Sequence, residues 1–354
     1  MTARSRWSGA LGMVAAAALA AAPAVAQVPA SGPLRGFKDW VIGCDNLRGC
    51  TALGLMADQG TGGFLRIERG GAAAAEPVVR FSVMVEAAEP KDAALTVVVD
   101  GQGAPAVDHR PARLQDGQVS LVLRGPSARG FIEALRLAHA VTLTLFDGTK
   151  AVQEVKVSLA GAAAALLFMD DQQKRTGTET ALVDHGGASA AAEPPVPALP
   201  AVAAMRMTVI DKPGRRPAGV PKPKDKGCPG DDLVIRLSAG EVLWGVCAFA
   251  AAYNWGYSFW RVGAGAPTAL KFALPGADPH DDGHVLVNPA LRADGLAITA
   301  LNKGRGLGDC GVIADWAWDG SAFRPVRIAE MRACGGVPPD DWPVLLRAQT
   351  NPRR

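Results

Sequence analysis

The chain has 354 residues and a formal net charge of +3, because 37 Lys and Arg residues nearly balance 34 Asp and Glu residues. A chain this close to neutrality has no overall positive field for nucleic acid, so the composition argues against a nucleic-acid-binding protein. Loss of Arg4 and Arg6 with the segment described next would lower the net charge further, to +1.

The first 26 residues have the pattern of a secretory signal peptide. Arg4 and Arg6 form a basic start, an apolar run of twelve residues covers 11–22, and Ala26 ends a small-x-small cleavage site. The apolar run is too short to cross a bilayer, which takes about 20 residues. No later stretch of the sequence is long and apolar enough to do so. The sequence therefore predicts cleavage near Ala26 and a periplasmic or secreted protein with no transmembrane segment.

Residues 33–184 are predicted to form an N-terminal β-rich domain. Apolar and polar residues alternate over 77–86, which places Val79, Phe81 and Val83 on one face of a strand. Further short strands follow, separated by Gly, Pro and Asp, and this regular spacing is typical of a sandwich or barrel. Two helices are expected among them, one capped by Ser127 and one following Ser158.

Residues 185–227 are predicted to be an Ala/Pro-rich linker followed by a basic loop. The linker part, residues 186–204, has almost no charge and no periodic apolar face. Residues 211–230 then contain six basic residues among several prolines. Such a loop is either simply solvated or an electrostatic contact for an anionic envelope polymer or a lipid headgroup. The sequence leaves both interpretations open.

Residues 228–354 are predicted to form a C-terminal β-rich domain. Asp319-Gly320 is a strong hairpin signal and joins two strand candidates. Trp316 and Trp318, two apart on the first of these strands, are expected to share one face. The tail, residues 339–349, is expected to form one short helix that Trp342 docks. The whole chain is thus predicted to be mainly β, with two β-sandwich- or barrel-like domains, a few short helices and disulfide staples.

Six cysteines remain after the predicted signal peptide, and an even number in an exported protein indicates disulfides. Cys44 and Cys50 are the two cysteines of the first half, so we pair them. In the second half, proximity in sequence favours the pairs Cys228–Cys247 and Cys310–Cys334. A thiol or metal site is the alternative, and the absence of a CxxC spacing disfavours it.

One acidic and imidazole-rich segment could ligate a metal. Asp278, His280, Asp282 and His284 lie within seven residues and offer ligands for zinc or copper. The segment fails as a calcium loop because Pro289 stands where the final Glu would be. A polar turn between two strands is the alternative explanation for the same residues.

An aromatic run covers residues 253–260 and could bind carbohydrate or peptide. Its candidate ligand-binding residues are Tyr253, Trp255, Tyr257 and Trp260. Tyr253, Trp255, Tyr257 and Phe259 share the parity that would place them on one face of a single strand, whereas Asn254 and Gly256 favour a turn equally. Burial of these rings in the core is the alternative, because aromatic residues are more often core residues than exposed ones.

Several segments resemble a bacterial exported family known as domain-of-unknown-function family 1176. They are residues 37–54, 158–182, 247–255 and 303–323, together with the tail around Cys334. The first half also resembles invasion-associated locus B proteins, through Trp40, Cys44, Cys50 and the small-residue segment 161–167. The resemblance to family 1176 brings no catalytic residues, and the resemblance to invasion-associated locus B proteins implies an envelope or host-contact role.

The sequence therefore favours an exported cell-envelope protein that binds or interacts without catalysis. Its expected partner is an envelope polymer or another envelope protein, and no cofactor is expected. The alternative is a metal-assisted or otherwise unrecognised periplasmic hydrolase, although no GxSxG nucleophile elbow and no P-loop is present. A pocket that brought a His together with Asp, Glu, Ser or a metal would favour the hydrolase.

Overall fold

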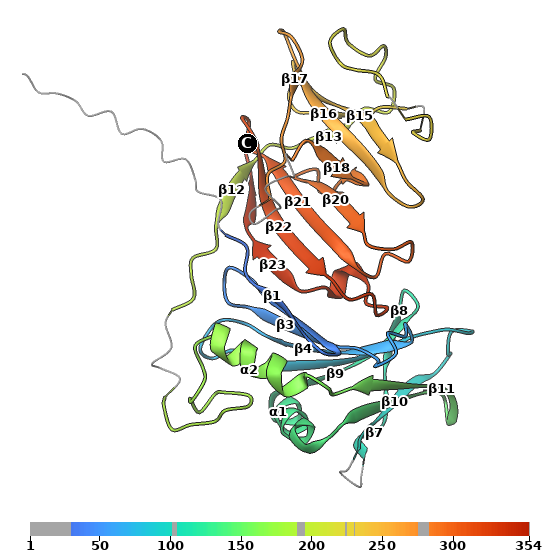
Figure 1. Cartoon of the computed structure of the whole chain (residues 1–354), viewed down its shortest axis with the longest axis vertical. Coiled ribbons are helices and arrows are strands. Elements are labelled where there is room, and N and C mark those ends of the chain that lie inside the picture. The colour runs from blue at the N-terminus through green and yellow to red at the C-terminus, as the bar shows by residue number, and fades with distance from the viewer. Residues whose placement is uncertain are drawn as a thin grey trace, which may run out of the picture.

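The computed structural model describes residues 30–100, 105–189, 195–223, 225–229, 231–274 and 283–353, and the predicted signal peptide lies outside them. Strands dominate this part of the chain and two α-helices accompany them (Figure 1). The prediction of a mainly β protein is therefore confirmed. No helix among the described residues has both the length and the apolar character needed to cross a membrane.

The first half contains two antiparallel sheets. The seven-stranded sheet has the order β1-β2-β3-β4-β5-β9-β8, and the four-stranded sheet has the order β11-β10-β6-β7. The strands of the larger sheet are β1 (Leu34–Phe37), β2 (Trp40–Cys44), β3 (Cys50–Gly54), β4 (Gly63–Arg69), β5 (Val78–Met84), β9 (Gln118–Arg124) and β8 (Arg113–Gln115). Those of the smaller sheet are β11 (Lys150–Ser158), β10 (Ala140–Asp147), β6 (Ala93–Val99) and β7 (Pro105–Pro111).

One hydrophobic core joins these two sheets and the helices α1 (Gly125–Ala134) and α2 (Ala162–Gln172). Val79, Phe81 and Val83 all lie in this core, as their alternation predicts. The expected cap of the first helix is wrong, because α1 begins before Ser127 and its N-cap is Arg124, without a side-chain cap. Pro at the start of α1 explains the earlier beginning, since its fixed φ suits the first helical turn.

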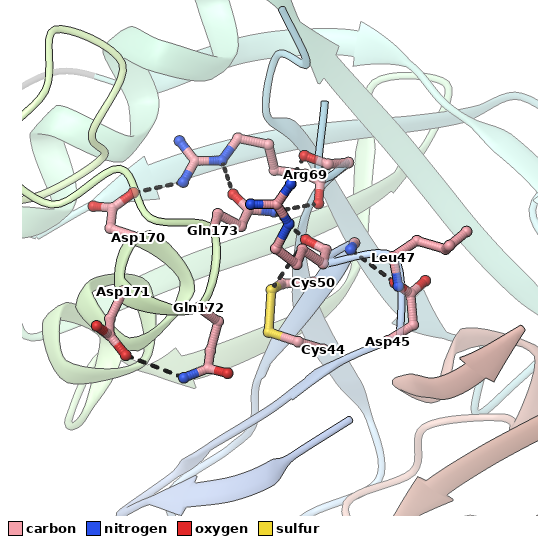
Figure 2. The surroundings of a disulfide bond; sticks show 12 residues. Cys44, Asp45, Leu47, Cys50, Arg69, Asp170, Asp171, Gln172 and Gln173 are labelled. Carbon is pink, nitrogen blue, oxygen red and sulfur yellow. Dashed lines mark hydrogen bonds and ion pairs between the residues drawn. A yellow bond between two sulfur atoms is a disulfide. The ribbon is translucent and has the colours of Figure 1, made fainter. Parts of the chain in front are cut away.

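A buried polar cluster fixes α2 to the first sheet (Figure 2). The guanidinium of Arg69 on β4 is fully buried and lies 2.5 Å from the Asp170 carboxylate. It also donates to Gln173 Oε1 at 2.6 Å and to the Thr180 carbonyl at 2.8 Å. Asp170 in turn accepts the N–H groups of Leu182 and Val183. The cluster therefore joins the sheet, the helix and the segment after the helix.

The second half contains two larger sheets and one pair of strands. The six-stranded sheet consists of β13 (Thr208–Val209), β14 (Leu233–Arg236), β15 (Val242–Ala250), β16 (Trp255–Val262), β17 (Thr268–Ala269) and β18 (Val285–Val287). The five-stranded sheet consists of β19 (Pro289–Leu291), β20 (Ile298–Lys303), β21 (Gly311–Trp318), β22 (Phe323–Met331) and β23 (Val344–Arg347). The pair consists of β12 (Ala201–Ala204) and β24 (Gln349–Pro352), which run parallel.

The segment predicted to be linker and basic loop contains two strands that belong to the second half. β12 pairs with the C-terminal β24, and β13 pairs with β14. Ala204, at the end of β12, is fully buried and packs with Ala317 and Val326 of the five-stranded sheet. The structure differs here from the expected irregular segment because these pairings are made with residues far away in sequence.

The Asp319-Gly320 hairpin is present, and Trp318 on β21 pairs with Phe323 on β22. Trp316 and Trp318 are both buried in the second-half core, as their spacing predicts. The predicted C-terminal helix is wrong. Only Pro339–Asp341 forms a single 3-10 turn, η3, and β23 follows it. Pro343 prevents helical continuation because it lacks an N–H group.

The two halves share a third hydrophobic cluster, formed by the outer face of the first sheet and by residues around β22 and β23. Trp342, 1% exposed, lies in this cluster with Leu53 and Phe64 from the first half. Polar contacts flank it. Asp341 lies 3.2 Å from the Arg80 guanidinium, and Arg347 donates to the Asp45 carboxylate at 2.6 Å.

This contact explains why β2 and β3 are buried on both faces. Trp40 and Ile42 of β2 point into the first-half core, whereas Val41 belongs to the cluster that both halves share. On β3, Ala52 and Leu53 divide in the same way. The burial of successive residues therefore follows from packing on two sides of one sheet.

Three disulfides join Cys44–Cys50, Cys228–Cys247 and Cys310–Cys334, so the predicted pairing is confirmed. Beside the last of them, the Asp309 carboxylate accepts the Gly336 N–H at 2.7 Å and pairs with Arg305. Burial by itself raises the pKa of Asp309, but the hydrogen bonds from Arg305 and Gly336 hold that pKa below its usual range. Asp309 and the disulfide therefore fasten the same two segments together.

We expect removal of the Cys310–Cys334 bridge to destabilise the protein by about 2–5 kcal/mol, because the bridge constrains the unfolded chain between residues 24 apart. The double variant Cys310→Ser/Cys334→Ser avoids leaving a free thiol, and urea unfolding measures its loss. Each single variant should lose about as much. A free, fast-reacting thiol at Cys310 in the native protein, with unchanged stability of Cys310→Ser, would contradict this structural role.

Candidate functional site: an aromatic cleft in the second half

A cleft of about 630 Å³ opens on the second half where β16 meets the segments around residues 228, 288 and 303. Its volume lies within the range of about 300–1,000 Å³ that is typical of ligand pockets. The Trp255 side chain is 41% exposed, which is unusual for so large an apolar group in the described part of the chain. Residues that line the cleft include Gly227, Pro229, Trp255, Tyr257, Asn288 and Lys303.

Strand β16 sorts the predicted aromatic run onto two faces. Trp255 and Tyr257 line the cleft, and the next residue of the same parity, Phe259, is buried in the core below. Trp260 lies on the opposite face and packs against a separate cluster that includes Trp244. Tyr253 precedes the strand, and its hydroxyl donates to the Gly304 carbonyl at 3.2 Å. Two of the four predicted aromatic residues are therefore brought together in the cleft.

Asn288 holds the start of β16 in place. Its side-chain oxygen accepts the Trp255 N–H at 3.0 Å, and its own backbone N–H donates to the Trp255 carbonyl at 2.8 Å. Its side-chain nitrogen donates to Asn254 Oδ1 at 2.8 Å and to the Leu301 carbonyl at 2.9 Å. Asn254 in turn accepts the Lys303 N–H. Three segments that are distant in sequence are thus fixed around the exposed Trp255 ring.

The basic loop forms one wall of the cleft and is anchored at several points. Cys228 is bonded to Cys247 on β15, and the Asp225 carboxylate accepts the N–H groups of Gly227 and Ala250. Arg216 pairs with both carboxylate oxygens of Asp232, at 2.8 and 2.6 Å. These contacts hold residues 225–228 in position beside the cleft.

Charge around the cleft is mixed. Lys303 lines it and has no carboxylate within ion-pair distance among the described residues. Burial raises the pKa of Tyr257, which also lines the cleft, and the negative charges of Asp232 and Asp231 raise that pKa further. Asp232 is already paired with Arg216, whereas Asp231 is exposed and has no ion-pair partner in the described part of the chain.

The predicted metal ligands are not assembled by what the structure describes. Asp278, His280 and Asp282 lie outside the described residues. His284 lies inside them, and its Nδ1 is 3.1 Å from the Leu270 carbonyl oxygen. The one ligand-like group among the described residues is Asp309 with Cys310 and Cys334. Because those two sulfurs form a disulfide, they cannot serve as thiolate ligands.

Sequence reasoning missed Asn288, Lys303 and the loop residues Gly227 and Pro229 as parts of the cleft. Asn288 adopts a left-handed backbone conformation, with φ of +49°. Asn tolerates this region better than most residues, so Asn before Pro289 at a strand junction was the available signal. No local pattern could have shown that it contacts residues 254 and 301.

Comparisons with known proteins give the following similarities. The family model "Protein of unknown function (DUF1176)" matches residues 34–349. The uncharacterized protein YpfG of Escherichia coli (strain K12) is 30% identical over 346 residues, which cover 88% of this chain and 92% of YpfG. The crystal structure of invasion associated protein b from Bartonella henselae is similar over 40% of this chain and 99% of that chain, with a TM-score of 0.31 and 16% identity.

Proposed function

We propose that this chain, which belongs to the family of proteins of unknown function DUF1176, is an exported cell-envelope protein that binds a glycan without catalysis. The observation that carries the proposal is the cleft in which Trp255 is exposed beside Tyr257. The C–H groups of a sugar ring carry partial positive charge, and they pack on the negative face of an aromatic ring. The wall around the ring is fixed before any ligand arrives, which lowers the entropic cost of binding.

A glycan fits this cleft better than an extended peptide. A peptide commonly binds by adding a strand to a free sheet edge. One edge of β16 is paired with β15, and the other is paired with β17 and β18. The backbone groups of Trp255 are used as well, by Asn288. Because no free edge of β16 lies at the cleft, recognition there has to use side-chain surfaces.

The residues of the cleft support binding more than hydrolysis. None of its described lining residues is an acid, a histidine, a cysteine or a serine. General acid–base hydrolysis of a glycan ordinarily needs a pair of carboxyl groups across the scissile bond.

A different cavity, of about 380 Å³ in the first half, does bring His139 together with Asp58, Asp100 and Ser158, which is the arrangement that favours the hydrolase alternative. There the Asp100 carboxylate accepts the backbone N–H groups of His139 and Ala140, and no hydrogen bond among the described residues joins the His139 ring to an acid or to Ser158. That cavity therefore lacks the paired base and nucleophile that a hydrolase needs.

Export is supported by the cysteines as well as by the predicted signal peptide. All six cysteines are paired in disulfides. Structural disulfides persist in the periplasm and outside the cell, and they are rare in the reducing cytosol. We therefore place the protein in the periplasm or the secreted fraction, where an envelope glycan is within reach.

We expect Trp255→Ala to weaken glycan binding at least tenfold, or about 1.4 kcal/mol, because the ring provides the largest exposed apolar surface of the cleft. Calorimetric titration with peptide-free glycan chains from peptidoglycan measures the change. Phe249→Ala is the matched control, since Phe249 is 38% exposed on β15 and its ring covers Gly256, on the face opposite Trp255. Equal binding by wild type and Trp255→Ala would refute the proposed site.

A further inference from the structure

We propose that the glycan bound in the aromatic cleft is anionic, and that Lys303 pairs with its carboxylate or phosphate group. This inference rests on the proposed function and adds the ligand's charge to it. Lys303 stands at the end of β20, and both its backbone N–H and its carbonyl are bonded to the Asn254 side chain. Its position at the cleft is therefore fixed by the network that also fixes Trp255.

The ammonium group of Lys303 is available to a ligand. It has no ion pair among the described residues, and two buried or half-buried carboxylates of the second half are engaged elsewhere: Asp309 with Arg305 and the Gly336 N–H, and Asp232 with Arg216 and the Trp244 indole N–H. Other carboxylates of the second half are already paired with arginines: Glu241 with Arg261, Asp294 with Arg292, and Asp319 with Arg324. A half-buried lysine without such a partner, on the wall of a cleft, is a ready site for a negative group.

The basic loop, which contributes Gly227 and Pro229 to the cleft, adds positive charge. Lys222 and Lys226 are exposed and have no ion-pair partner in the described part of the chain, and Lys226 directly precedes the cleft residue Gly227. Asp231 provides the opposing charge near Tyr257. The cleft thus has one lysine in its lining, Lys303, a second beside the lining residue Gly227, and one unpaired carboxylate, Asp231. An anionic sugar would be attracted to the two lysines and repelled by Asp231.

The decisive experiment compares an anionic glycan with its neutral amide, and then with a phosphate saccharide and an acidic peptide. The carboxylate probe is the peptide-free glycan of alternating N-acetylglucosamine and N-acetylmuramic acid, whose lactyl groups are ionised, and the neutral probe is the same glycan amidated with methylamine. A phosphorylated glucosamine disaccharide is the phosphate probe, and polyglutamate is an acidic peptide. We expect the wild type to prefer a carboxylate or phosphate saccharide, and the better of the two identifies the group that Lys303 binds.

Variants then locate the charge. Lys303→Gln should weaken binding of the anionic saccharide at least tenfold and leave the neutral glycan unaffected, whereas Lys303→Arg should retain binding. Asp231→Asn should tighten binding of the anionic saccharide, and Lys150→Gln, on the first half, should change neither. Added salt screens the charge pair, so it should lower the affinity of the wild type for the anionic saccharide until it approaches the affinity of Lys303→Gln.

The two proposals fail in different ways. Suppose that binding depends on Trp255 but has the same affinity for neutral and anionic glycan, and the same affinity in Lys303→Gln. This result refutes the proposal that the ligand is anionic, and the proposed glycan site remains valid. Lack of any Trp255-dependent glycan binding overturns the site itself. Preference for polyglutamate over every saccharide, lost in Trp255→Ala, overturns the glycan and assigns the cleft to an acidic peptide.

Discussion

Asp170→Ala should destabilise the protein by about 3–5 kcal/mol, because it leaves the fully buried guanidinium of Arg69 without its counter-ion. The change also removes the acceptor for the N–H groups of Leu182 and Val183, so the segment after α2 loses its attachment. Urea unfolding monitored by tryptophan fluorescence measures the loss. Exported yield should fall as well, since the loss is a large fraction of the 5–15 kcal/mol that stabilises a typical protein.

The next residue along α2 is the matched control. Asp171 is 62% exposed at its side chain and lies 3.9 Å from Lys174, so Asp171→Ala should change stability by less than about 0.5 kcal/mol. The double variant Arg69→Met/Asp170→Leu removes both charges and should be more stable than Asp170→Ala alone. If Asp170→Ala unfolds at the same urea concentration as Asp171→Ala, the buried pair does not hold α2 in place.

Features set by local sequence could be predicted, and the Asp319-Gly320 hairpin is an example. The dipeptide Asp-Gly favours a tight turn by its own conformational preference, so it predicts the pairing of β21 with β22 without knowledge of the rest of the fold. The three disulfides could be predicted for a similar reason, because each joins two cysteines with no other cysteine between them in the sequence. The alternation of Val79, Phe81 and Val83 likewise reports the face that one strand buries.

Features that depend on distant partners could not be predicted. The tail reads as a short amphipathic helix, but Leu345 packs into the cluster shared by the halves while Leu346 packs into the second-half core. Adjacent residues that point to opposite sides require a strand, and β23 forms because β22 offers an edge for it. Pairing of Arg69 with Asp170, 101 residues later, is hidden for the same reason.

In the candidate site too, the features set by local sequence could be predicted, and those set by distant partners could not. The aromatic run marks Trp255 and Tyr257 in the sequence, because clustered aromatic residues stand out by composition alone. Whether a ring is exposed depends on what covers it, and Trp260 differs from Trp255 only by the face of β16 on which it lies. Lys303 carries no such signal, and Asn288 is marked only as a residue at a strand junction, before Pro289. Their role comes from hydrogen bonds that join three separate segments.

Trp342→Ala should uncouple the two halves as well as destabilise them, and the loss should be about 3–5 kcal/mol, as for other buried tryptophans. The Trp342 indole is 1% exposed, and its N–H donates to the Val337 carbonyl at 2.8 Å. It fills the cluster that Leu53 and Phe64 share with the second half. Without it, the cluster loses its largest side chain, and the remaining contacts between the halves include the polar contacts of Asp341 and Arg347, which water can replace.

Two measurements separate uncoupling from simple destabilisation. In calorimetry the wild type should unfold in one transition, and Trp342→Ala should unfold in two. After proteolytic cleavage in residues 186–204, the wild-type pieces should co-elute in gel filtration and the Trp342→Ala pieces should separate. Trp318→Ala is the control, because Trp318 is equally buried but lies in the second half's own core. It should lower the transition temperature and leave the pieces associated. If Trp342→Ala also keeps one transition and associated pieces, the cluster around Trp342 adds stability without joining the halves.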